Sequence, residues 1–342
     1  MNRPFAFRLP YRQQGLTLIE LLVAMVIGLV IVLAAVASLT VARTGFTAVD
    51  ASSQLRDNGR FASDLIQRIG AQAGYLSSDI LTLPVADPPS GGSGASTLVP
   101  SIGGFNSLLI NATDPTAPGS ARSGSDPGFG SDVLILRYQA SRLFTDSTDT
   151  TSDRTMIDCA GNAVDTVINS TGGDRIVSVF HVAINQGEPS LMCTYSPTGT
   201  APWTTVPLIQ GVEKFQVLFG TDGVIAKAAT VATAAPDVPD RYLRADQIKV
   251  DASDTDTKKN WGRVRSIRVG LVLRGAIGSA QGNTSQTFHA FGEAASSGGS
   301  AAAAGSAFAS NADEGTEFTP TPDSRLRQTV TFTVHLRNDQ SL

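Results

Sequence analysis

The sequence has few of the residues on which several function classes depend. Charged side chains make up 16% of its 342 residues, against roughly 25% in an average soluble domain. Only five lysines stand among the 26 basic residues and the formal net charge is −4, which argues against a nucleic-acid binder. Two cysteines exclude a disulfide-rich scaffold and a four-cysteine zinc site. With 42% apolar residues, the chain is too apolar to be disordered as a whole.

Catalytic and cofactor-binding patterns are also missing. The three histidines, His181, His289 and His335, stand singly and have no second ligand at metal spacing. The absence of any Gly-Lys pair excludes a Walker A loop. The nearest approach to a nucleophile elbow, GGSGA at 91–95, lacks the final glycine and a preceding strand. We therefore expect neither an enzyme nor a bound cofactor.

Three carboxylates in the run DASDTDT, Asp251, Asp254 and Asp256, raise the question of a calcium site. Their spacing does not match an EF-hand loop, and no glycine follows at the position where that loop turns. We interpret them as solvated loop carboxylates and predict no metal site.

The N-terminus carries the strongest signal. Residues 1–15 hold three arginines and no acid, and residues 16–39 are apolar apart from one glutamate, one threonine and one serine. From Leu21 to Leu39 no residue is charged, a length that crosses a bilayer core at about 1.5 Å per residue. The positive-inside rule predicts that residues 1–15 lie in the cytoplasm and that the chain after Arg43 lies outside.

The segment GLTLIE at 15–20 resembles the class III signal of type IV prepilins and type II secretion pseudopilins. The resemblance implies that a prepilin peptidase cuts after Gly15 and methylates Leu16. It also implies that Glu20, fifth in the mature chain, meets the N-terminal amine of a neighbouring subunit during assembly. Two charges are tolerated in lipid when they neutralise each other. The chain departs from the family in having Leu16 in place of the commoner Phe or Met, and in lacking a proline later in the helix.

An ordinary secretory signal peptide is the alternative interpretation of this terminus. Ala35-Val36-Ala37 could serve as an A-x-A cleavage site, with the mature chain starting at Ser38. However, the apolar stretch is longer than the roughly 7–15 residues of a signal peptide, and a glutamate near its start is unusual there. We therefore favour the prepilin interpretation.

The hydrophobic pattern predicts that the helix continues beyond the apolar stretch. Nothing between Arg43 and Ile69 stops a helix firmly, and apolar residues recur mostly at three-, four- or seven-residue steps. We predict one helix over 16–75, membrane-spanning at 16–39 and amphipathic at 40–70. The apolar stripe predicted to pack on a globular domain consists of Phe46, Val49, Leu55, Ala62, Leu65, Ile66 and Ile69.

Two further stretches are similar to minor pilins of the PilW type. GRFA at 59–62 is followed by AGY at 73–75, at the expected distance from the first motif. The C-terminus has a similar R…TV…LRN pattern, here Arg327, Thr333-Val334 and Leu336-Arg337-Asn338. The resemblance covers the N-terminal helix specifically and the C-terminal strand loosely.

Residues 76–342 are predicted to form a β-rich domain outside the membrane. Apolar runs or strict alternation predict strands at 133–138, 175–183, 214–219, 266–273 and 326–337. Few helical patterns separate them, so we predict an antiparallel sheet and an α+β, pilin-like fold. Stretches rich in Pro, Gly and Ser at 87–130 and 292–316 are predicted to be flexible loops.

The two cysteines, Cys159 and Cys193, lie outside the membrane by the topology argument, in an oxidising compartment of a bacterium. No CxxC motif or histidine partner indicates a reactive site. We predict a disulfide that closes a loop of roughly 35 residues and stabilises the fold by about 3.5–4 kcal/mol. The alternative is two unpaired buried thiols.

Together these features predict a minor pilin that is added to a type IV pilus, or primes its assembly, and so serves adhesion, twitching motility or DNA uptake. The expected partners are the prepilin peptidase, other minor pilins, the major pilin, the inner-membrane assembly platform and the lipid bilayer. The expected location is the inner membrane, with one span, and then the pilus at the cell surface. A J-class type II secretion pseudopilin is the closest alternative, and a tip adhesin that binds through its loops is another.

Overall fold

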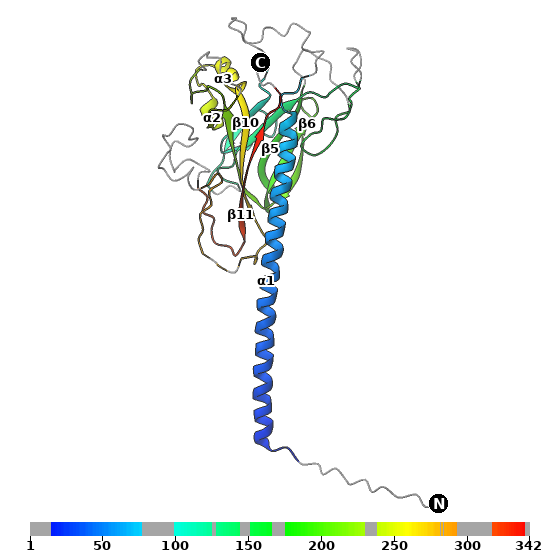
Figure 1. The fold of residues 1–342 in the computed structure, drawn as a ribbon, viewed down its shortest axis with the longest axis vertical. Coiled ribbons are helices and arrows are strands. Elements are labelled where there is room, and N and C mark those ends of the chain that lie inside the picture. Colours follow the sequence, from blue (N-terminus) through cyan, green and yellow to red (C-terminus); the bar gives the residue numbers. More distant parts are fainter. Residues whose placement is uncertain are drawn as a thin grey trace, which may run out of the picture. The chain divides into compact units, whose positions relative to one another are not determined.

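The computed structural model describes residues 15–76, 99–124, 128–143, 151–165, 175–229, 238–280, 282, 284–292 and 317–338. The chain divides into two compact units, Met1–Asp50 and Ala51–Leu342. Figure 1 shows the elements within them. The leader before Gly15, the start of the predicted loop 87–130 and nearly all of the predicted loop 292–316 lie outside the described residues.

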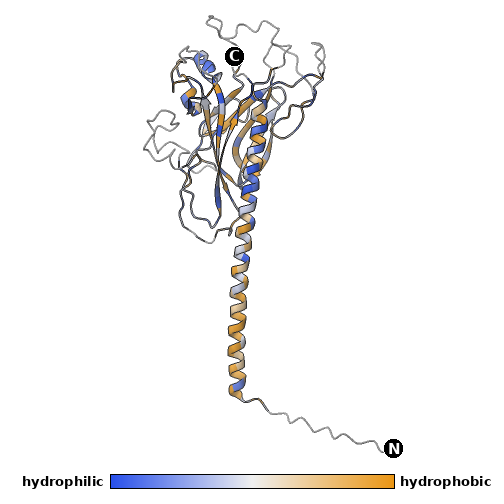
Figure 2. Ribbon diagram, in the orientation of Figure 1, coloured by the Kyte–Doolittle hydropathy of each residue, from blue (hydrophilic) through white to orange (hydrophobic). Residues whose placement is uncertain are grey.

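One long helix, α1 (Leu18–Gln72), contributes to both units. In the first unit its large apolar side chains are exposed, and Figure 2 shows most of this part as hydrophobic, with a hydrophilic residue at the start of the helix. In the second unit one face of the helix is buried at steps of mostly three or four residues, which is the spacing of a single helix face. The residues of this buried face are Ala51, Leu55, Gly59, Ala62, Ile66, Ile69 and Gly70.

The buried face begins later along the helix than the sequence pattern predicts. Phe46 and Val49 are 76% and 68% exposed, so they do not belong to it. Nine residues separate Phe46 from Leu55, which at 3.6 residues per turn places the two side chains on opposite sides of the helix. The six-residue step from Val49 to Leu55, which does not return to the same helix face, therefore joined two different faces into one predicted stripe.

The second unit is built on two antiparallel sheets, which confirms the predicted α+β class. The five-stranded sheet has the order β1-β4-β5-β6-β7 and the four-stranded sheet the order β11-β10-β8-β9. The first comprises β1 (Ile102–Phe105), β4 (Val133–Tyr138), β5 (Ile176–Asn185), β6 (Glu188–Ser196) and β7 (Thr204–Gln210). The second comprises β8 (Val212–Thr221), β9 (Arg241–Leu243), β10 (Val264–Arg274) and β11 (Arg327–His335). The remaining elements are β2 (Leu108–Ile110), β3 (Pro118–Ala121), α2 (Ala245–Ile248) and α3 (Asp254–Trp261).

The predicted loop 87–130 contains three strands, β1, β2 and β3, within its described part, so that prediction is wrong there. At least one of the described glycines in this stretch, Gly104, has a packing role. A Cβ on Gly104 of β1 would lie 2.6 Å from the carbonyl oxygen of Val133 on the paired strand. Glycine is therefore needed for the close approach of two backbones, not for a flexible connection.

The acidic run at 251–257 is also not a loop throughout. Ser253 caps the N-terminus of α3, because its hydroxyl accepts a hydrogen bond from the backbone N–H of Asp256. Asp254 and Asp256 lie in the first turn, where negative charge is favoured by the helix dipole. This helix-start pattern explains the acidic residues without a metal ion.

Strand β8, whose alternation of apolar and other residues predicted a strand, is buried on both faces. Lys214 is 3% exposed, and its ammonium lies 5.1 Å from the ring centre of Phe318 and 5.4 Å from that of Phe129. These rings come from segments far away in the sequence that cover the second face of the sheet. The alternation of residues therefore predicted that a strand forms here, but not that both of its faces are buried.

His181 of β5 is 2% exposed, and its Nε2 lies 2.9 Å from the hydroxyl of Thr194. Burial, helped by the nearby charge of Arg122, lowers the pKa of His181 from 6.5 to about 4. The unfolded chain therefore binds a proton at a pH where the folded chain does not, and stability is lost as pH falls from 6.5 toward 4.

We expect the free energy of unfolding to fall by about 2–3 kcal/mol, because of this histidine, when the pH is lowered from 7.5 to 4.5. Urea titrations at the two pH values measure the loss. The variant His181→Gln should lose less stability over this range, whereas His335→Gln, at an exposed position, should behave like the natural chain. Equal losses in all three proteins would show that His181 does not control this pH dependence.

Candidate functional site

The first turn of α1 is closed by a capping box formed by Thr17 and Glu20. One carboxylate oxygen of Glu20 accepts hydrogen bonds from the backbone N–H of Thr17 at 3.0 Å and from its hydroxyl at 2.8 Å. In return, the Thr17 hydroxyl accepts from the backbone N–H of Glu20 at 3.3 Å. Each side chain thus satisfies an N–H at the helix start. Glu20 has a partner within its own chain, which the T-x-x-E spacing could have indicated from the sequence.

The residues just before the helix are non-helical and accessible. Gly15, Leu16 and Thr17 precede the first helical residue, and Leu16 is 77% exposed. A Cβ built on Gly15 meets no atom within 4 Å. A peptidase needs this arrangement, because it must bind the backbone on both sides of the bond that it cuts. Gly15 and Leu16, on the two sides of the predicted cleavage, are both exposed, whereas the residues before Gly15 lie outside the described part of the chain.

The apolar part of α1 is suited to a lipid environment. Among the described residues, α1 is one helix whose length and composition allow it to cross a membrane. Its 18-residue window of highest hydropathy has no buried residue. Large apolar side chains such as Leu29 and Leu33 are 71% and 68% exposed. An apolar surface of this length is unfavourable in contact with water and favourable in contact with lipid. The helix and the signal that precedes it indicate membrane anchoring.

In the second unit, two glycines bring α1 close to strand β11. A Cβ on Gly59 would lie 2.7 Å from Val330, and one on Gly70 would lie 2.6 Å from Val334. Both distances are shorter than a van der Waals contact, so a larger side chain would push the helix away from the sheet. The glycine of the GRFA stretch is therefore explained by helix–strand packing, as is Ala62, which is fully buried.

The C-terminus of α1 is held by the other two resemblance motifs. Gly74 of the AGY stretch takes the left-handed conformation, with φ of 79°, that commonly ends a helix, and its N–H donates to the carbonyl of Arg137 at 3.0 Å. Asn338 of the LRN stretch donates from Nδ2 to the carbonyls of Ala71, Gln72 and Ala73, at 3.3, 3.4 and 3.0 Å. These carbonyls lie at the helix end, where the intrahelical hydrogen-bond pattern stops, and the Gln72 carbonyl also accepts from the backbone N–H of Tyr75 at 3.0 Å.

We expect Asn338→Asp to lower the free energy of unfolding by about 2–3 kcal/mol, and Asn338→Ala by about 1 kcal/mol. The aspartate is worse because its negative charge faces three carbonyl oxygens at the negative end of the helix dipole. Arg337→Ala, at the exposed neighbouring position, should change stability by less than about 0.5 kcal/mol. Urea denaturation of the three variants measures the order, and an equal effect of Asn338→Asp and Arg337→Ala would contradict the capping role.

Cys159 and Cys193 are joined by a disulfide, and both residues are fully buried. The disulfide ties the segment 151–165 to strand β6. Two hydrogen bonds hold this segment to the end of α1, because the Gln72 side chain accepts from Ile157 N–H at 2.9 Å and donates to its carbonyl at 3.2 Å. The disulfide thus supports the position of the helix end.

Within the described ranges, no group of three or more His, Cys, Asp or Glu side chains could hold a metal ion. The buried histidine, His181, bonds to a threonine, and the GGSGA stretch at 91–95 lies outside the described residues. The features that the described residues do show are an accessible N-terminal signal before α1 in the first unit and a clamped C-terminal end of α1 in the second.

Two family models match the chain. The model described as Type IV Pilus-assembly protein W matches residues 179–338, from β5 to the capping Asn338. The model of the prokaryotic N-terminal methylation motif matches residues 10–36, which include Gly15, Leu16 and Glu20. No curated protein matches the chain. Among solved structures, a type IV-like pilin from Thermus thermophilus is similar, with 11% identity over 83% of this chain and 95% of that one, and a TM-score of 0.34.

Proposed function

We propose that this chain, a type IV pilus minor pilin of the PilW family, is cut after Gly15, methylated at Leu16 and added to the pilus through contacts of Glu20. The observation that carries the proposal is the order of features at the helix start. An accessible glycine is followed at once by a helix whose one early acidic residue precedes a long uncharged segment. This is the order that cleavage, anchoring and assembly each require.

Cleavage changes the electrostatics at this end of the helix. Before cleavage, the carboxylate of Glu20 is satisfied by Thr17 of the same chain. Cleavage creates an amine at Leu16, and both the amine and Glu20 are costly in lipid when they are unpaired. We infer that Glu20 of one subunit meets the N-terminal amine of the next, so that assembly removes two exposed charges together. The Thr17 hydroxyl remains available to cap the helix during this exchange.

The proposed topology follows from the same features. The three arginines before Gly15 stay in the cytoplasm, residues 16–39 span the inner membrane, and the β domain lies in the periplasm until assembly. The prepilin peptidase, other minor pilins, the major pilin and the assembly platform are the proposed partners. The pilus assignment is favoured over a secretion pseudopilus by the match of residues 179–338 to the PilW model.

Mass spectrometry of the protein purified from a piliated host tests the proposal. The expected N-terminus is a methylated Leu16, and in a strain without prepilin peptidase the chain should keep its leader. A mature chain that starts at Ser38 would show an ordinary signal peptide instead. An uncut chain in the strain that has the peptidase would equally overturn the proposal.

A further inference from the structure

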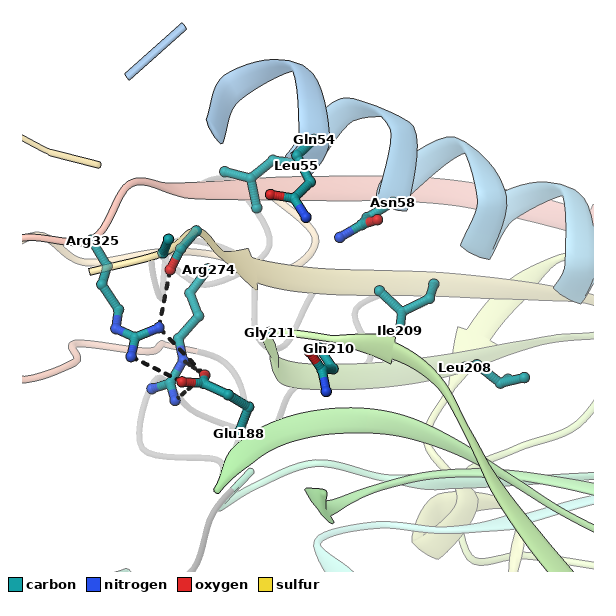
Figure 3. Close-up of a pocket in the computed structure, with 12 residues that line it drawn as sticks. Gln54, Leu55, Asn58, Glu188, Leu208, Ile209, Gln210, Gly211, Arg274 and Arg325 are labelled. Carbon is teal, nitrogen blue, oxygen red and sulfur yellow. Dashed lines mark hydrogen bonds and ion pairs between the residues drawn. The ribbon is translucent and has the colours of Figure 1, made fainter. Parts of the chain in front are cut away.

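Near the groove that residues of α1 and β7 line, arginines of low exposure are paired with carboxylates. Figure 3 shows Arg274 and Arg325, which both contact Glu188 beside this groove, at 2.7 and 3.0 Å. Arg327, whose side chain is 6% exposed, contacts Glu213 at 2.6 Å. This is the usual arrangement, because a buried charge is costly unless an opposite charge compensates for it.

Two other arginines, Arg137 and Arg175, are buried without such a carboxylate. Arg137 lies in β4 and is 8% exposed, and Arg175 immediately precedes β5 and is 3% exposed. Among the residues that the structure describes, neither arginine forms an ion pair. Asp114, whose charge also acts on Arg137, is exposed and bonds to Thr116 instead.

Both guanidinium groups converge on the three residues that precede β1. Arg137 donates from Nη1 to the carbonyl of Pro100 at 3.0 Å. Arg175 donates from Nη1 to the hydroxyl of Ser101 at 3.0 Å and from Nη2 to the carbonyl of Val99. These acceptors are neutral, so they satisfy some of the N–H groups but leave two positive charges without an opposite charge.

The two positive charges persist at neutral pH. Burial lowers the pKa of each arginine to about 10, and for Arg137 the charge of Arg175 adds to this shift while that of Asp114 opposes it. Because this pKa lies well above 7, both side chains stay protonated. They therefore repel each other in a region from which water is largely excluded.

One donor of the pair also lacks an acceptor. The Nε of Arg175 is buried and makes no hydrogen bond. Arg241 likewise has a buried Nε without a hydrogen bond, but Asp240 compensates its charge at 3.4 Å. Arg175 thus combines an uncompensated charge with an unsatisfied buried donor, a combination that in a native protein points to a missing acceptor.

The arginine pair can be approached from the edge of the five-stranded sheet. Strand β1 is this edge, and its Gly103 pairs with Ile135 of β4. Gly103 is half-buried, and a Cβ built on it would lie 3.6 Å from Nη1 of Arg137. A larger side chain at this position would cover the guanidinium group, whereas glycine leaves space beside it.

We propose that Arg137 and Arg175 bind a small oxyanion of the phosphate class, which enters beside Gly103. Two guanidinium groups from different strands match a doubly charged, tetrahedral anion, because its oxygens accept hydrogen bonds from several directions. The anion compensates both positive charges and supplies the acceptor that Arg175 lacks. This site lies in the β domain and requires no pilus partner, so the inference does not depend on the proposed function.

Equilibrium dialysis of the full chain in detergent against radiolabelled inorganic phosphate tests the proposal. The natural chain should bind one phosphate, which sulfate displaces and chloride at the same concentration does not. Arg175→Gln should weaken the binding at least tenfold. Arg154→Gln, at an exposed arginine that pairs with Asp165, is the control and should bind as the natural chain does. Absence of saturable phosphate binding by the natural chain would overturn the proposal.

A second variant keeps both arginines, since loss of Arg175 also removes hydrogen bonds to residues 99–101. Gly103→Leu fills the space beside Nη1, and its Cβ meets only ordinary van der Waals contacts. Phosphate affinity should fall at least tenfold, with thermal unfolding in phosphate-free buffer unchanged. Gly124→Leu, at a glycine with no atom within 4 Å of a built Cβ, is the matched control.

Hydrogen exchange shows where the anion binds. Phosphate should slow exchange at residues 99–103 in the natural chain and in Gly124→Leu, but not in Gly103→Leu. Equal phosphate binding by the natural chain and Gly103→Leu would place the anion elsewhere and overturn the proposal. None of these measurements involves cleavage or assembly, so their failure leaves the proposed function standing.

Discussion

Replacement of Glu20 by alanine is expected to leave cleavage after Gly15 intact and to remove the protein almost completely from assembled pili. In the proposed cleavage, the peptidase acts on the non-helical residues before the helix, and the described hydrogen bonds of Glu20 to them are those with Thr17. The proposed assembly, in contrast, buries the N-terminal amine of a neighbouring subunit beside Glu20. A charge left unpaired in lipid costs about 2.5–3.5 kcal/mol, which corresponds to a loss of roughly 100-fold in the assembly equilibrium.

The measurement is an immunoblot of sheared pili, normalised to the processed protein in the membrane. Glu20→Gln is the matched control, because glutamine can still accept the hydrogen bond of the capping box but carries no charge. If charge neutralisation drives assembly, Glu20→Gln should fail as Glu20→Ala does. Normal piliation with Glu20→Gln would mean that Glu20 acts by capping the helix. Normal piliation with Glu20→Ala would refute an assembly role altogether.

Removal of the disulfide, by Cys159→Ala together with Cys193→Ala, is expected to lower the free energy of unfolding by about 4 kcal/mol. The two cysteines are 34 residues apart, so the bond restricts a long loop in the unfolded chain. A further local effect is expected, because this loop presents Ile157 to Gln72 at the end of α1. Loss of the bond should therefore loosen the clamp on the helix as well as destabilise the domain.

Urea denaturation of the full chain in detergent measures this loss, and the natural protein under reducing conditions is the control. The reduced natural chain and the double variant should have similar stabilities, both well below that of the oxidised protein. Hydrogen exchange at residues 69–73 should rise in the double variant before global unfolding. A loss below about 1 kcal/mol would show that the packing around the cysteines, not the bond, stabilises the segment.

The structure gives a physical reason for three residues in the GRFA, AGY and LRN stretches. Gly59 allows α1 to approach Val330, Gly74 ends the helix, and Asn338 caps it. The roles of Gly59 and Asn338 could not be inferred from local sequence, because Gly59 and Val330 are far apart in the chain and Asn338 and Ala73 are 265 residues apart. The motif positions were visible in the sequence, but the contacts that require them exist only after folding.

Some predictions were wrong because one local sequence pattern is compatible with more than one structure. The Pro, Gly and Ser content of 87–130 predicted a loop, yet glycine there also permits two strands to approach closely. Strand β7 was not predicted, because Pro207 interrupts it and an edge strand tolerates proline where an inner strand does not. Its position at an edge is a property of the sheet, which no local window of sequence contains.

The sequence by itself determined the features that depend on short-range order. These are the signal at Gly15, the uncharged length after Glu20, and the periodicity of the helix and of most strands, since each depends on residues within a few turns or one strand. The tertiary structure alone decided which face of α1 is buried, why β8 is covered on both sides, and where the groove beside β7 lies. Each of these depends on segments that are distant in sequence and meet only when the hydrophobic effect brings the sheets and the helix together.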